Sequence, residues 1–146
     1  MSTSFWLRSA SILTLLLALG HSTGYPWTPD LGAESMAVVA RMQAVHFTVI
    51  GFEQSYWAFY VGFGLTISVM LLLLAVLLWQ LPAAVPDARK ARSLLVVMLV
   101  AFAAISKLDW MFFFTAPLVL AVAITLCLGL ALRSLGSDAP VSAPSP

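Results

Sequence analysis

The sequence predicts an all-α integral membrane protein: a bundle of four membrane-spanning helices, with an extracytoplasmic amphipathic helix between the first two spans. Of the 146 residues, 62% are hydrophobic and only 9% are charged, whereas a soluble domain has about 45–50% apolar and about 25% charged residues. So few charges cannot cover a surface that faces water, so we expect lipid to surround most of the chain. Four apolar stretches also approach the length of about 20 residues that a helix needs to cross a bilayer.

The second span is the clearest. The predicted spans cover about residues 5–21, 55–81, 90–107 and 115–134, within a single membrane domain at 1–135. No charged residue occurs at 54–86. Tyr56 near the start of this span and Trp79 near its end place amphipathic rings at both membrane interfaces. Gly64 and Ser68 are small residues at which a second helix can approach closely.

The third and fourth spans are predicted to form a helical hairpin. The third lies between Arg92 and Lys107, and it reaches spanning length if both cations extend their aliphatic stems toward the interface. A tight connection that contains Asp109 follows. Thr115 can cap the fourth helix, and Pro117 falls in its first turn, where a missing N–H has little effect.

The first span has a competing interpretation. Arg8 followed by a short apolar core also describes a secretory signal peptide. However, no Ala-x-Ala cleavage site precedes the polar residues that begin at His21, and the apolar stretch from Phe5 is just long enough to cross the membrane. We therefore predict a retained span, with a cleaved signal peptide as the alternative.

The segment between the first two spans has two parts. Residues 25–30 are rich in turn formers and exclude a regular helix. Over residues 33–50, apolar residues recur at helical spacing, with Glu34 and Arg41 between them. This pattern predicts an amphipathic helix that lies on the membrane surface or runs into the second span, with a bend at Gly51.

The distribution of cations predicts the orientation. One side of the membrane would carry Arg8, Arg89, Lys90, Arg92 and Arg133, and the other only Arg41 and Lys107. Because cytoplasmic loops carry the excess of Lys and Arg, both chain ends are predicted to be cytoplasmic. Residues 136–146 contain mainly Ser, Ala and Pro without an apolar period, which predicts a disordered tail.

Several function classes lack support. The formal net charge of +1 argues against nucleic acid as a partner. The only cysteine, Cys127, lies in an apolar stretch, so there is neither an intramolecular disulfide nor a Cys-x-x-Cys motif. The sequence also lacks a Gly-x-Ser-x-Gly motif and a phosphate-binding glycine loop. No charge is predicted at the middle of a span, which argues against ion transport.

The remaining polar side chains gather near the predicted extracytoplasmic interface. If the helix continued through Gly51, then His46, Glu53 and Tyr60 would lie on one stripe. That stripe would face inward, because carboxylates and imidazoles are unfavourable against lipid. We therefore predict a small polar pocket open to the outer side. Its candidate residues are His21, His46, Glu53, Tyr60, Asp109 and Trp110.

Each candidate also has a plainer interpretation. The two histidines would bond a carbonyl or water at the interface, Glu53 and Asp109 would be solvated carboxylates, and Trp110 would belong to an interfacial aromatic belt. Two histidines on different helices could instead hold haem, and with Glu53 they form a chemically sensible metal-ligand set. No short spacing such as His-Glu-x-x-His supports a metal. Catalytic residues and cofactors therefore stay unassigned.

Three stretches resemble a known family: residues 20–24 (GHSTG), 45–47 (VHF) and 55–64 (SYWAFYVGFG). They are similar to a family of small four-span bacterial membrane proteins of unknown function, over nearly the whole chain before the tail. The resemblance implies an inner-membrane location and a retained first span, but it supplies no activity. Members of that family often carry a basic residue near the position of Glu53, which counts against a role for this carboxylate.

Three functions stay open from the sequence. The first is an integral inner-membrane protein that binds an apolar or lipid-like ligand, or a membrane partner that could be a second copy of the chain. The second is a haem- or metal-binding redox protein that uses His21 and His46. The third is a membrane enzyme for an apolar substrate, with Glu53, Asp109 and a histidine as acid and base. We favour the non-enzymatic function, because it needs only the spans and their packing faces.

Overall fold

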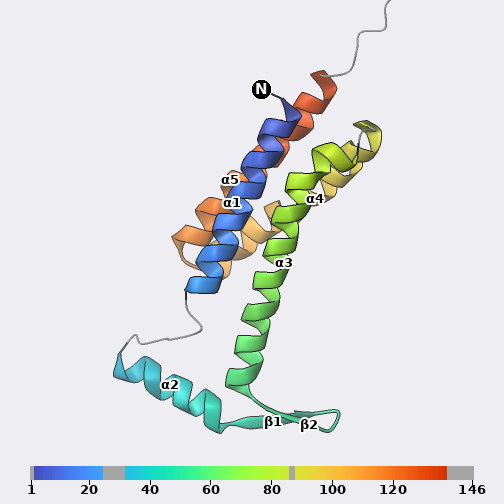
Figure 1. Ribbon diagram of the computed structural model, residues 1–146. Helices are drawn as coiled ribbons and strands as arrows, with labels where there is room; N and C mark the ends of the chain where they lie inside the picture. Colours follow the sequence, from blue (N-terminus) through green and yellow to red (C-terminus); the bar gives the residue numbers. More distant parts are fainter. Residues whose placement is uncertain (1, 25–31, 86–87, 138–146) are drawn as a thin grey trace, which may run out of the picture. The chain divides into compact units, whose positions relative to one another are not determined.

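The computed structural model describes residues 2–24, 32–85 and 88–137 (Figure 1). Within these ranges the elements follow in the order α1 (Thr3–Thr23), α2 (Ala33–Ala44), β1 (His46–Val49), β2 (Phe52–Ser55), α3 (Tyr56–Ala84), α4 (Ala88–Phe112) and α5 (Thr115–Ser137). The turn-rich segment at 25–30 and residues 138–146 of the predicted tail lie outside the described residues. The first two residues of that tail, 136 and 137, instead belong to the end of α5.

The all-α fold class with four candidate membrane spans is confirmed. Thr3–Thr23, Tyr56–Ala84, Arg89–Phe112 and Thr115–Leu135 are long and apolar enough to cross a membrane. The third helix is longer than predicted, because it continues through Lys107 to Phe112. The predicted tight connection at Asp109 is wrong: the Phe113 N–H donates to the Asp109 carbonyl at 3.0 Å. No Gly or Pro interrupts the chain there, so the helix adds another turn.

The chain forms two compact units. Unit 1 consists of residues 1–17 and 72–146, and unit 2 consists of residues 18–71. α1 and α3 therefore each contribute one part to each unit, whereas α4 and α5 belong to unit 1, and α2 and the strands belong to unit 2.

The core of unit 1 is built from almost fully buried side chains. α4 and α5 pack along each other, and the buried positions on each helix recur every three, four or seven residues, so they share a face. These positions are Leu7 and Ala10 of α1, Ala75 and Leu78 of α3, Leu95 and Phe102 of α4, and Ala121, Ile124 and Leu128 of α5. The alanines among them let helix backbones approach closely, as is typical of membrane helices.

Hydroxyl groups add hydrogen bonds between the helices of unit 1. The buried Ser11 of α1 donates to the Ala75 carbonyl of α3 at 2.7 Å. The hydroxyls of Ser106 and Thr125 lie 3.3 Å apart between α4 and α5. Arg8, although inside the first candidate span, is exposed and lies over the Trp79 ring at 5.2 Å. A cation over an indole ring is partly stabilised without a carboxylate partner.

Unit 2 corrects one predicted element. The helix predicted over residues 33–50 ends at Ala44, and β1 and β2 pair antiparallel, with Val49 opposite Phe52. Residues 45–50 are β-branched and aromatic apart from His46, a composition that favours extended backbone. Gly51, at φ 82°, completes the turn where a helix bend was expected. The single helical stripe of His46, Glu53 and Tyr60 therefore does not form.

We expect Ser11→Ala to lower the free energy of unfolding by about 0.6 kcal/mol, the mean for hydrogen bonds between membrane helices. The change removes the bond to Ala75 and leaves the packing almost unaltered. Ser93→Ala is the matched control, because Ser93 is exposed on α4. Unfolding in mixed detergent micelles, followed by circular dichroism, measures both variants. Equal stability of the two would show that the Ser11 bond does not stabilise the helix pair.

Candidate functional site

His21 lies in the last turn of α1, half-buried, with Nε2 3.0 Å from the Gly64 carbonyl oxygen of α3. A carbonyl only accepts hydrogen bonds, so Nε2 carries a proton, and in the neutral ring Nδ1 then keeps its lone pair. Ser68 donates to the same carbonyl at 3.1 Å, and the Ser22 hydroxyl lies 3.0 Å from that of Ser68. His21, Ser22, Gly64 and Ser68 thus form one polar cluster between α1 and α3, called the His21 cluster below.

His46 is placed differently. It is the first residue of β1, it is exposed, and its Nδ1 lies 3.2 Å from the Ala44 carbonyl oxygen. Because the carbonyl only accepts, Nδ1 carries a proton, and in the neutral ring Nε2 then keeps the lone pair. The strand register pairs His46 with Ser55 and Thr48 with Glu53. Side chains of directly paired residues share a face of a hairpin, so His46 and Glu53 lie on the same exposed face.

The remaining candidate in unit 2 is Tyr60, on α3. Tyr60 is 39% exposed, and its ring lies 5.7 Å from that of Trp57, measured between centroids. Among the described residues, no group of three His, Cys, Asp or Glu side chains could hold a metal ion. The predicted ligand set of His21, His46 and Glu53 therefore gains no support from the geometry.

Asp109 and Trp110 belong to unit 1. Asp109 is only 8% exposed, in the last turn of α4, and within the described part of the chain its buried Oδ2 has no hydrogen-bond partner. It is thus a buried carboxylate rather than the solvated one that the plainer interpretation assumed. Trp110 is 71% exposed, and the three phenylalanines at 112–114 are 58–73% exposed. This stretch therefore has the exposure expected of an interfacial belt.

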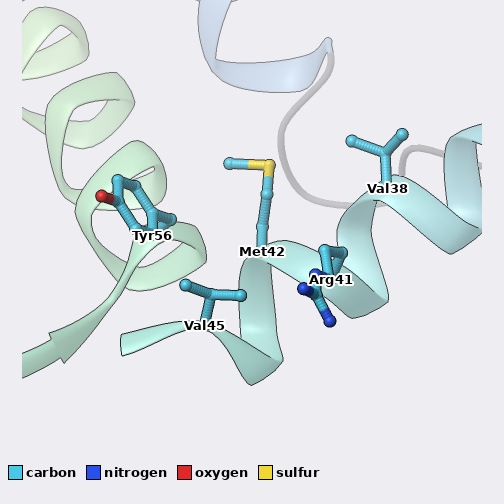
Figure 2. A pocket seen from close by; sticks show the side chains of 5 residues that line it. All are labelled: Val38, Arg41, Met42, Val45 and Tyr56. Carbon is cyan, nitrogen blue, oxygen red and sulfur yellow. The ribbon is translucent and has the colours of Figure 1, made fainter. Parts of the chain in front are cut away.

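A surface hollow lies beside α2, on the side of the start of α3 (Figure 2). Its volume is about 250 Å³, and its lining consists of Val38, Arg41, Met42, Val45 and Tyr56. Val38, Met42 and Val45 are spaced by four and three residues, so they form one apolar stripe. The Tyr56 N–H donates to the Val45 carbonyl at 3.2 Å and fixes the far wall.

Sequence reasoning missed this hollow. The apolar stripe on α2 was visible, but Tyr56 reaches it only because the β1–β2 hairpin returns the chain to Val45. A helix through Gly51 would have carried Tyr56 away from α2. The amphipathic pattern of residues 33–45 was the one available signal.

Comparison of the chain with protein-family models, curated proteins and solved structures gives no match. Membership of the four-span family that the sequence resembles therefore stays a prediction. Among the described residues, the hollow beside α2 is a surface pocket with an apolar lining.

The two histidines are expected to carry their protons on opposite nitrogens. At a pH where both rings are neutral, ¹⁵N spectra of histidine-labelled protein in detergent should show an Nε2–H tautomer for His21 and an Nδ1–H tautomer for His46. His46→Gln assigns the signals, since it removes only one set. An Nδ1–H tautomer at His21 would contradict its bond to Gly64.

Proposed function

We propose that this chain is a multi-pass protein of the bacterial inner membrane that binds a lipid-like molecule with an acidic head group at the hollow beside α2. The observation that carries this proposal is the apolar lining, to which Val38, Met42, Val45 and Tyr56 contribute side chains and Arg41 contributes its aliphatic stem (Figure 2). The guanidinium at the end of that stem would bind the acidic head group outside the apolar lining, because guanidinium groups bind carboxylate and phosphate through paired, charge-assisted hydrogen bonds. The apolar side chains suit the first methylene groups of an acyl chain.

The size of the hollow indicates that it would enclose only part of the proposed ligand. Its volume of about 250 Å³ lies below the roughly 300–1,000 Å³ of sites that enclose a whole drug-sized ligand. Tyr56, which forms one wall, is also the first residue of the 29-residue helix α3. A ligand held there would keep the rest of its acyl chain along the span, in the bilayer.

The exposed surface of the helices supports a lipid environment. Large apolar side chains along α3, among them Leu65, Val69 and Val76, are 45–60% exposed. Such continuous apolar exposure is unfavourable in water and ordinary in hydrocarbon. The inner-membrane location rests on the resemblance to the four-span family, and we propose membership of that family.

The proposed orientation of the chain in the membrane rests on the distribution of its Lys and Arg residues. With Arg89, Lys90 and Arg92 on the cytoplasmic side, both chain ends are cytoplasmic. The loop that contains α2 and the hairpin then lies on the extracytoplasmic side. The hollow would receive its ligand from the outer leaflet.

The orientation can be tested with single cysteines in a Cys127→Ala background. We expect Thr48→Cys, on the exposed hairpin, to react with a membrane-impermeant maleimide in intact spheroplasts, and Ser142→Cys, beyond α5, to react only after lysis. The comparison needs both variants, since each is the other's control for expression and labelling. The reverse pattern would overturn the proposed orientation.

Ligand binding can be tested with phosphatidic acid as the probe, by native mass spectrometry of the detergent-solubilised protein. Arg41→Gln should weaken retention of the lipid about tenfold, because a hydrogen bond to a charged group contributes roughly 1.5–3 kcal/mol. Arg133→Gln is the control, since Arg133 is exposed on α5 and makes the same change in charge. Equal losses in the two variants would mean that the lipid binds through net charge alone.

A further inference from the structure

The β1–β2 hairpin has one polar and one apolar face. Side chains alternate along a strand, and directly paired residues share a face. The register therefore assigns the polar face to His46, Thr48, Glu53 and Ser55, and the apolar face to Phe47, Val49 and Phe52, with Gln54 at its edge. A hairpin of two strands is only marginally stable in water, so the apolar face needs a cover.

The base of the apolar face is covered by the chain itself. The Phe47 ring lies 4.9 Å from that of Tyr56 and 5.4 Å from that of Phe59, measured between centroids. The Ser55 hydroxyl accepts from the N–H of Ala58 at 3.1 Å and so caps the start of α3. These contacts attach the base of the hairpin to the first turns of the helix.

The tip is exposed. Val49 is 55% exposed, Phe52 is 76% exposed and Ile50 is 94% exposed. Ile50 and Gly51 have φ values of 51° and 82°, the signs required at the two central positions of a type I′ turn, where Asn-Gly is preferred. A β-branched residue at positive φ is strained. The chain thus keeps a large apolar side chain at a position where both its backbone and its exposure to water are unfavourable.

We propose that the hairpin inserts its tip, formed by Val49, Ile50 and Phe52, into the interfacial layer of the membrane beside α3. Lipid is the occupant that the chain connectivity favours. Ser55 is followed directly by Tyr56, the first residue of a candidate span, and a strand of four residues is only about 13 Å long. The tip therefore cannot leave the neighbourhood of the bilayer surface.

The direction of the hairpin supports the same occupant. Figure 1 shows β1 and β2 running across the direction of the first turns of α3 rather than along it. With α3 crossing the membrane, the hairpin then lies along the membrane surface. The apolar face can meet the acyl boundary while His46 and Glu53 remain in water, which removes the need for a protein partner to cover the tip. This proposal requires the membrane span but not the ligand at the hollow.

The test uses the full-length protein with Cys127→Ala, reconstituted into phosphatidylcholine vesicles. An environment-sensitive fluorophore is attached at Ile50→Cys or, on the polar face, at Thr48→Cys. We expect the Ile50 label to emit at shorter wavelength and to be quenched several-fold less by iodide, and several-fold more by a shallow nitroxide lipid, than the Thr48 label. Equal accessibility of the two labels, whether both are shielded or both are open, would overturn the proposal.

A second variant separates insertion from folding. Ile50→Asn creates the Asn-Gly pair that type I′ turns prefer, so the hairpin should be retained while the apolar tip is lost. A label at Val49→Cys should then lose its protection from iodide when Ile50→Asn is added. Unchanged protection would show that the tip does not drive insertion. Retention of phosphatidic acid, measured separately, reports on the hollow and distinguishes a failure of this proposal from a failure of the proposed function.

Discussion

Within hydrocarbon no water is available to bond an exposed peptide group, so each segment that crosses the membrane has to satisfy its own backbone hydrogen bonds. The four long apolar helices meet this requirement. The β1–β2 hairpin does not, because both outer edges of a two-stranded sheet keep unpaired N–H and C=O groups. It can therefore place apolar side chains in the interfacial layer but cannot enter the hydrocarbon itself. The same constraint explains why the hairpin occurs at the end of a span rather than within one.

Lipid also changes what holds the helices together. Apolar contact with a neighbouring helix has little advantage over contact with lipid, so close packing and hydrogen bonds decide which faces meet. Ser11 bonds to Ala75, and His21 bonds to Gly64, at positions where small residues bring the backbones close. Asp109 departs from this pattern, since its buried Oδ2 has no partner among the described residues. An unpartnered buried oxygen lowers stability.

The sequence predicted those features that depend on composition and local periodicity. The spans follow from hydropathy, and the start of α2 follows from its apolar stripe. The end of α2 was not predictable in this way, because residues 45–50 satisfy a helical period and also have the β-branched and aromatic composition of a strand. Pairing with residues 52–55 makes residues 46–49 a strand, and hydrophobic periodicity does not indicate such pairing. For the candidate site, His21 was found without its partners, and His46 and Glu53 were grouped for the wrong reason: they share a hairpin face, not a helical stripe.

Tyr56 and Val45 connect the two proposed lipid contacts within unit 2. Tyr56 lines the hollow, and its ring also contacts Phe47 at the base of the hairpin. Val45 lines the hollow as well, and its carbonyl accepts the Tyr56 N–H. A shift of the hairpin relative to α3 would therefore move two of the five side chains that line the hollow. Insertion of the tip into the bilayer restrains that shift, so the depth of the hairpin and the shape of the hollow depend on the same pair of residues.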